Sequence, residues 1–175
     1  MKLSAPVNIR SDHIMGSLNA QIVIVEYGEY ESPYTGMAYR VVEEMLRRFG
    51  DKIYFVFRNF TLSDIHPPAQ HAAETAEAAA ARDKFWQMQG YLFEHQKALD
   101  DSHLLEYARK VGLDVDRFKK ELSERVSAPQ INESLKTGTD SSVEGTPTFF
   151  VNGIRYEDSW DIDTFSNELN KSLNR

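Results

Sequence analysis

The sequence of 175 residues contains no cysteine. A chain without cysteine forms no disulfide, and it offers neither a thiolate nucleophile nor a sulfur ligand for a metal ion. We therefore expect no dithiol–disulfide exchange by the chain's own residues.

Long apolar runs and blocks of positive charge are also missing. No apolar run approaches the about 20 residues that span a bilayer, and the net charge of −7 leaves no basic face for a phosphate backbone. We therefore expect a soluble protein with no nucleic-acid partner and no membrane role. Residues 1–11 are polar and lack the apolar centre of a signal peptide, so we expect a cytoplasmic protein, although a mature secreted form would have the same sequence. The oligomeric state is not indicated.

The apolar residues that are present, 41% of the chain, predict an ordered core. Residues 21–27 (QIVIVEY) and 52–57 (KIYFVF) are rich in β-branched and aromatic side chains, which predicts two buried strands. Between them, apolar side chains recur at helical spacing from Met37 to Phe49, and Gly50 ends the repeat. A strand, a helix and a strand over about 35 residues indicate a βαβ unit with parallel strands.

The middle of the chain has a different pattern. Residues 61–142 contain no strand-like run and show several helical repeats, of which one is expected to be capped by Ser102. The Ala-rich segment 69–82 predicts a packing helix, on which Glu74 and Glu77 are expected to form a solvated face.

The last third returns to strands. Residues 148–151 and 154–156 flank Asn152-Gly153, which is a strong hairpin signal, and residues 161–173 predict a terminal helix. The order βαβ, helices, ββα predicts an α/β domain made of residues 1–60 and 143–175, with an inserted helical subdomain at 61–142.

Two segments carry a resemblance to a known family. Residues 28–36 (GEYESPYTG) resemble the active-site segment of the DsbA-like thiol–disulfide oxidoreductases, a bacterial-type family in which this segment usually contains Cys-Pro-Tyr-Cys. Residues 145–153 (GTPTFFVNG) resemble the family's cis-proline loop and the hairpin that follows it. Weaker matches occur in the same order from about Asp12 to Tyr156. The resemblance implies a thioredoxin fold with an inserted helical subdomain.

The resemblance also assigns residues to a degenerate catalytic site. Ser32 and Thr35 occupy the two cysteine positions, and Glu26 is expected to lie beneath them, where the family has a carboxylate that helps to move protons. A serine hydroxyl stays neutral at neutral pH, because a helix N-terminus supplies only about 0.3–2 kcal/mol toward its ionisation. Ser32 is equally well interpreted as a helix N-cap. For Glu26 we favour a buried carboxyl with a raised pKa and no catalytic task.

A substrate-binding groove is implied as well. Pro147 is expected to be cis, and the backbone of Thr146 is expected to pair with an extended substrate, opposite Pro33 and Tyr34. Strand addition of this kind requires no cysteine.

The five histidines indicate no metal site. His66 and His71 are five residues apart, rather than the four that place two ligands on one helix face, and the other three are scattered. We expect surface or capping roles for them and no metal cofactor.

Three functions remain open. The first is a redox-inactive DsbA-like protein that binds a peptide or a thiol partner in the cis-proline groove. The second is a glutathione-dependent enzyme, because Ser-Pro-Tyr also resembles the active-site start of kappa-class glutathione transferases, in which the serine hydroxyl binds the glutathione thiolate. The third is a structural or regulatory scaffold. No cofactor is expected, and glutathione enters only as a possible ligand.

Overall fold

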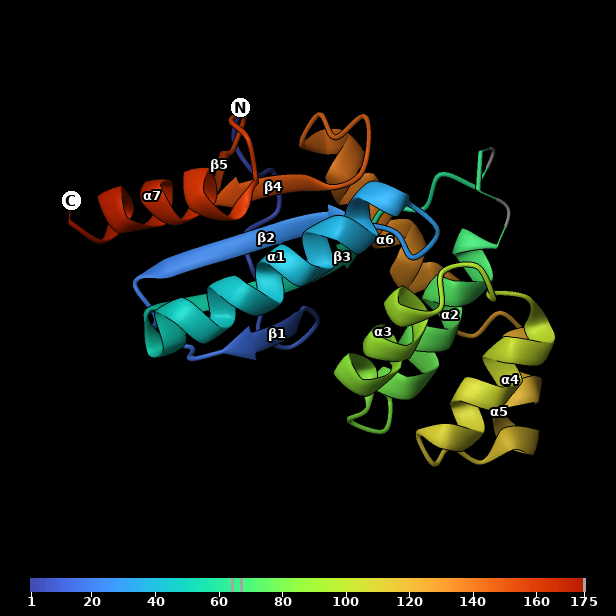
Figure 1. Cartoon of the computed structure of the whole chain (residues 1–175). Coiled ribbons are helices and arrows are strands. Elements are labelled where there is room, and N and C mark those ends of the chain that lie inside the picture. The colour runs from blue at the N-terminus through green and yellow to red at the C-terminus, as the bar shows by residue number, and fades with distance from the viewer. Residues whose placement is uncertain (64, 67, 175) are drawn as a thin grey trace.

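The two β-branched runs form the centre of a five-stranded sheet (Figure 1). The computed structural model describes residues 1–63, 65–66 and 68–174. In chain order the elements are β1 (His13–Gly16), β2 (Ile22–Gly28), α1 (Pro33–Phe49), the 3-10 helix η1 (Gly50–Lys52), β3 (Ile53–Asn59), α2 (Ala69–Ala80), α3 (Phe85–Glu94), α4 (Asp101–Lys110), α5 (Val115–Ser123), α6 (Ala128–Asp140), β4 (Thr148–Val151), β5 (Ile154–Arg155) and α7 (Ile162–Leu173).

The strands lie in the order β1-β3-β2-β4-β5. β2 and β3 are parallel and are joined through α1, as the βαβ pattern predicts, whereas the other pairs are antiparallel. In the turn between β4 and β5, Asn152 and Gly153 have positive φ angles of 49° and 77°, which is the geometry that an Asn-Gly hairpin adopts. The predicted α/β class is therefore confirmed, and β1 is an additional edge strand.

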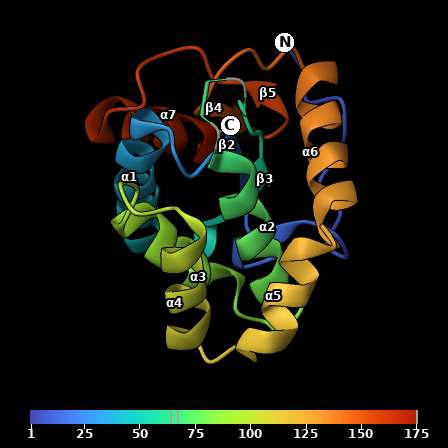
Figure 2. The same ribbon diagram turned by 90° about the vertical axis from the view of Figure 1, so that its right-hand side faces the viewer.

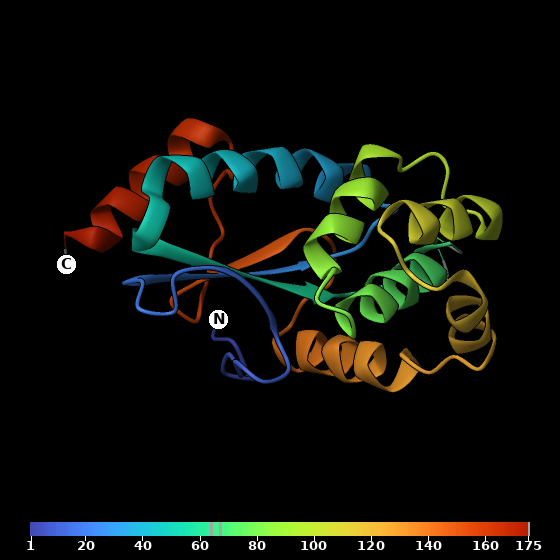
Figure 3. The ribbon, with the colours of Figure 1, turned by 90° about the horizontal axis from the view of Figure 1, so that it is seen from below.

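Helices cover both faces of this sheet. Viewed from below, α1 and α7 lie on one side of the strands and α6 on the other (Figure 3). Side chains alternate accordingly: Ile24 and Phe55 pack into the main core, whereas Val25 and Val56 join a second apolar cluster with Leu135 of α6. This alternation decides which residues of β2 and β3 face the N-terminus of α1.

Helices α2 to α5 lie together beyond one end of the strands (Figures 1 and 2). The solvated face predicted for Glu74 and Glu77 of α2 is wrong, because these side chains are only 2% and 6% exposed. Small alanine side chains allow α3, α4, α5 and α6 to pack against α2 from several directions, and this packing covers the glutamates. Glu74 accepts hydrogen bonds from Gln70 and Arg125.

The start of α4 also differs from the prediction. The N-cap is Asp100 rather than Ser102, and its side chain accepts hydrogen bonds from the backbone N–H groups of Ser102 and His103. The helix therefore begins at Asp101, two residues earlier than a cap at Ser102 would place its start, because the Asp100 side chain satisfies these two amides.

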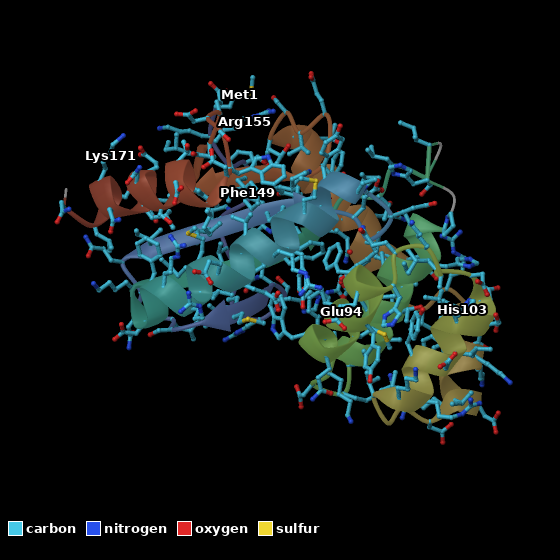
Figure 4. All side chains as sticks on the ribbon, in the orientation of Figure 1. Met1, Glu94, His103, Phe149, Arg155 and Lys171 are labelled. Carbon is cyan, nitrogen blue, oxygen red and sulfur yellow. The ribbon has the colours of Figure 1, made fainter. Side chains whose placement is uncertain are left out.

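The first residues of the chain extend the β5 edge of the sheet. The N–H of Leu3 donates to the carbonyl of Gly153, and the N–H of Arg155 donates to the carbonyl of Met1. Met1 and Arg155 accordingly lie next to each other, above Phe149 (Figure 4). Within the described residues, no helix has both the length and the apolarity needed to cross a membrane.

Candidate functional site

The site is centred on the N-terminus of α1, where the chain leaves β2. Ser32 is the N-cap, with an extended backbone, and Pro33 occupies the first turn, where its missing N–H costs no hydrogen bond. The Ser32 hydroxyl oxygen accepts a hydrogen bond from the N–H of Thr35 at 3.2 Å. The interpretation of Ser32 as a helix cap is therefore what the structure shows.

The same hydroxyl connects α1 to the loop before β4. Ser32 Oγ donates to the carbonyl oxygen of Thr146 at 3.3 Å, and the Thr146–Pro147 peptide bond is cis. Thr148 Oγ1 donates to the carbonyl of Gly145 at 2.8 Å and fixes the other side of this loop. Ser32 is only 3% exposed. Its buried hydroxyl is already hydrogen-bonded to both a donor, the N–H of Thr35, and an acceptor, the carbonyl of Thr146.

Gln96 holds the segment that precedes α1, and no sequence pattern pointed to it. Its Nε2 donates to the carbonyl oxygens of Tyr30 and Ser32, both at 2.8 Å. Gly36 makes this possible, because a Cβ at that position would overlap the Gln96 amide. The loop after α3 therefore fastens the helical part of the chain to the start of α1.

Glu26 lies beneath this helix start, on the face of β2 that belongs to the main core. It is 2% exposed, and burial raises its pKa to about 8, so the carboxyl is protonated at neutral pH. Its Oε1 has no hydrogen-bond partner among the described residues. The burial and the raised pKa expected for Glu26 are both found, while its chemical role stays a prediction.

Thr35, at the second cysteine position, points down toward the same place. A Cβ built on Gly28 would lie 2.7 Å from Thr35 Cγ2, 2.8 Å from Phe57 Cε2 and 3.2 Å from Glu26 Oε1. These three side chains therefore converge on Gly28. Thr35 is fully buried, and its hydroxyl also has no partner within the described part of the chain.

A second group of buried polar side chains lies on β3 and α2, and no motif in the sequence predicted it. Asn59, two residues after Phe57 on β3, donates through Nδ2 to Glu77 Oε1 at 2.9 Å. Glu77 also contacts His13 Nε2 at 2.9 Å, and the His13 ring is stacked on Phe85. Two of the five histidines thus pair with buried carboxylates, because His66 likewise binds Glu29. No group of three or more potential metal ligands occurs among the residues that the structure describes.

The outer surface of the site is apolar. Tyr34 and Met37, one helical turn apart on α1, are 63% and 59% exposed, and Pro33 beside them is exposed as well. Across from them, Pro147 is half-buried and adjoins a cavity of about 400 Å³ that is also lined by Tyr156 and Trp160. The structure therefore brings Ser32, Thr35, Glu26 and Thr146 together, and leaves Pro33 and Tyr34 on the outside.

Comparisons with known proteins agree with this geometry. A family model described as thioredoxin matches residues 8–171. BdbD from Bacillus subtilis has a TM-score of 0.86 at 21% identity, over 99% of each chain. α-DsbA1 from Wolbachia pipientis has a TM-score of 0.84 at 17% identity, over 98% of this chain and 94% of that one. The DsbA-like thioredoxin fold implied by the resemblance is therefore confirmed.

The proteins that this chain resembles in sequence are longer than the chain itself. The chain is 44% identical, over 94% of its length, to a protein named Na(+)/H(+) antiporter NhaA 1 from Salinispora arenicola, of which the match covers 25%. The chain thus spans about a quarter of the length of this relative.

The predicted cytoplasmic location is wrong. A periplasmic thioredoxin-like protein from Salmonella enterica serovar Typhimurium has the same fold, with a TM-score of 0.77 at 16% identity over 96% of this chain and 93% of that one. The fold therefore also occurs in a protein described as periplasmic, and it gives no support to a cytoplasmic location. A polar first segment was a poor guide, because it does not distinguish a cytoplasmic protein from a secreted one whose leader has been removed.

Proposed function

This chain belongs to the thioredoxin family, and we propose that it is a DsbA-like binding protein that holds an extended peptide without exchanging disulfides. The observation that carries the proposal is that the surface available to a peptide is exposed while the two cysteine positions are buried. The apolar surface of Tyr34 and Met37 is exposed beside the Thr146–Pro147 loop, whereas both cysteine positions are buried and occupied by hydroxyl side chains.

Redox inactivity follows from the chemistry of these positions. Exchange requires a thiolate that attacks a disulfide sulfur, and the chain has no cysteine. The Ser32 hydroxyl is instead committed to the Thr146 carbonyl and the Thr35 N–H. Glu26 remains below as a protonated carboxyl with no thiol to serve.

Peptide binding is supported by the surface groups. The ring of Tyr34 and the side chain of Met37 offer apolar contact area, and aromatic side chains of this kind dominate binding energies at interfaces. An extended chain would add backbone hydrogen bonds with Thr146, whose carbonyl oxygen keeps one lone pair after it accepts from Ser32. Affinity should be modest, because ordering a flexible peptide offsets much of the contact energy.

The glutathione alternative is weakened by the same geometry. A thiolate bound to Ser32 would need access to a hydroxyl that is 3% exposed, and it would have to displace the Thr146 carbonyl. The transport named for the antiporter relative is likewise not proposed for this chain, which matches only 25% of that protein.

The test uses a peptide that cannot react. The reduced and carboxymethylated B chain of insulin has no free thiol, and its titration into isotopically labelled protein should shift the amide signals of Tyr34, Met37 and Thr146. Tyr34→Ala should raise the dissociation constant about tenfold, as expected when an aromatic side chain that anchors the peptide is lost.

Leu18→Ala is the matched control, because Leu18 is an equally exposed large side chain, at 57%, in the turn before β2. This variant should bind as the unchanged protein does. If no signal near α1 moves with any peptide, or if both variants lose affinity alike, the proposal fails and the scaffold function remains.

A further inference from the structure

A separate cavity of about 320 Å³ lies at the end of β3, where α6 and residues 5–12 form its walls. Ser32, Tyr34, Thr146 and Pro147 do not line it, so it is distinct from the peptide site. Its volume is within the range of small-ligand sites, about 300–1,000 Å³.

Asn59, which lines the floor of this cavity, carries a hydrogen-bond acceptor without a donor. Asn59 donates through Nδ2 to Glu77 Oε1. Because a carboxylate only accepts, this bond fixes the orientation of the amide and turns Asn59 Oδ1 away from Glu77. Asn59 is 2% exposed, and its Oδ1 has no partner among the described residues. A donor on a ligand would satisfy it.

The wall contributed by α6 has a second group of this kind. Ser134 Oγ is buried and has no partner within the described part of the chain. Glu133, the residue before it, is exposed at the rim of the cavity. Unpartnered oxygen atoms therefore occur on both the floor and the α6 wall, and negative charge lies at the rim.

The one arginine among the lining residues does not reverse this balance. Arg58 is 7% exposed and is paired with Asp12 through two hydrogen bonds of 2.8 Å. Its remaining N–H groups donate to Tyr27 and to the carbonyls of Ala5 and Pro6. Arg58 thus has all five donors engaged and its charge balanced by Asp12. His13, which also lines the cavity, is paired with Glu77 at 2.9 Å, so Glu133 at the rim sets the sign of the cavity.

We propose that this cavity binds a protonated amine or guanidinium group, which donates hydrogen bonds to Asn59 Oδ1 and Ser134 Oγ. Glu133 at the rim attracts the positive charge, and a protonated nitrogen supplies the donors that Asn59 Oδ1 and Ser134 Oγ lack. The group belongs either to a free small amine or to a lysine or arginine side chain of another protein.

Two probes separate these sources. Agmatine carries an amine and a guanidinium group, and the peptide acetyl-Gly-Arg-Gly-amide presents guanidinium on a backbone. Titration of the full chain, followed by amide chemical shifts, should give saturable changes at Asn59 and Ser134 at millimolar concentration or below. The tighter probe identifies the source, and binding should weaken as the salt concentration rises.

Variants on α6 test the contacts without disturbing the core. Glu133→Lys, at an exposed position, should weaken binding of the tighter probe at least tenfold. Glu43→Lys makes the same change of charge on α1, across the sheet, and should leave affinity within about twofold, since exposed charges at that distance are screened. Ser134→Ala removes a hydroxyl that has no partner in the structure, so it should not lower stability, yet it should weaken binding several-fold.

Three results would overturn the proposal. The first is the absence of saturable shifts at Asn59 and Ser134 with either probe. The second is an equal loss of affinity in Glu133→Lys and Glu43→Lys, which would mean that only the net charge attracts the probe. The third is a Ser134→Ala variant that binds as tightly as the unchanged chain.

Discussion

Replacing Glu26 by glutamine should remove a large part of the pH dependence of folding. Burial raises the pKa of Glu26 from 4.5 to about 8. Between these two values the folded protein holds the proton and the unfolded chain has released it, so each unit of pH increase lowers the free energy of unfolding by about 1.4 kcal/mol. The stability is therefore intact below the unfolded pKa and is lost as the pH rises toward about 8, by about 5 kcal/mol in total.

The Glu26→Gln variant keeps the shape of the side chain and cannot ionise. The difference in unfolding free energy between the variant and the unchanged protein should grow in the variant's favour by about 4 kcal/mol from about pH 5 to about pH 8.5. Urea denaturation followed by circular dichroism, at constant ionic strength, measures this difference. The absolute offset at low pH is less informative, because the glutamine amide leaves a buried polar group in the same place.

The control is Glu43→Gln, since Glu43 is an exposed residue of α1 that lines the same small cavity as Glu26. Its stability should follow the unchanged protein at every pH. If the Glu26→Gln difference grows by less than about 1 kcal/mol over this range, the carboxyl is hydrated or paired in solution, and the reasoning from burial is refuted.

Two further changes test the packing and the lost chemistry. Gly138→Ala should destabilise the protein by about 1–2 kcal/mol, because the added Cβ would lie 2.5 Å from the Phe60 ring. Gly90→Ala, in α3, should stabilise it by about 1 kcal/mol, because the added Cβ meets nothing closer than 3.5 Å and alanine favours the helix. If thermal unfolding gave both changes the same sign, this account of the packing would be contradicted. Restoring cysteine at Ser32 and Thr35 together should confer insulin reduction above the thiol-only background, since both positions sit at the start of α1. A folded but inert double variant would mean that more than the two sulfur atoms has been lost.

The strands that could be predicted from the sequence are those whose burial shows in their composition. β2 and β3 are continuous apolar runs, and their predicted bounds agree with the structure to within one or two residues. β1 was missed, because its four residues HIMG contain a single β-branched side chain and form too short a run to predict a strand. Its strand geometry comes from pairing with β3, with His13 opposite Phe57, and tertiary contacts of this kind leave no local signal.

The residues of the candidate site likewise divide into those that a sequence motif predicted and those that only tertiary contacts reveal. Ser32, Thr35, Glu26 and Thr146 were found through the motifs, and the structure brings them together. Gln96 was missed, because a loop residue that binds two carbonyls belongs to no periodic pattern. The predicted division into residues 1–60 with 143–175 and an insert at 61–142 stays a prediction, although α2 to α6 do lie between β3 and β4.

The burial of Glu77 shows why composition misled the interpretation of α2. A glutamate between alanines looks solvated when the helix is expected to bury only one face. Alanine, however, permits close approach on every side, and an Ala-rich helix is thus as well suited to the centre of a helical cluster as to its surface.

The hydroxyl side chains at the two cysteine positions hold the site by contacts of their own, beside the exposed surface proposed to contact a peptide. Ser32 now joins the β2–α1 junction to the loop before β4 through one hydroxyl, and Thr35 packs its methyl group against Gly28. Both side chains are buried, so neither belongs to the exposed face on which Tyr34 and Met37 lie. In the proposed function, the two cysteine positions and the residues proposed to contact a peptide are different: the first are buried and the second are exposed. Substitution at two buried positions therefore removes both thiols without altering the exposed side chains of Tyr34 and Met37.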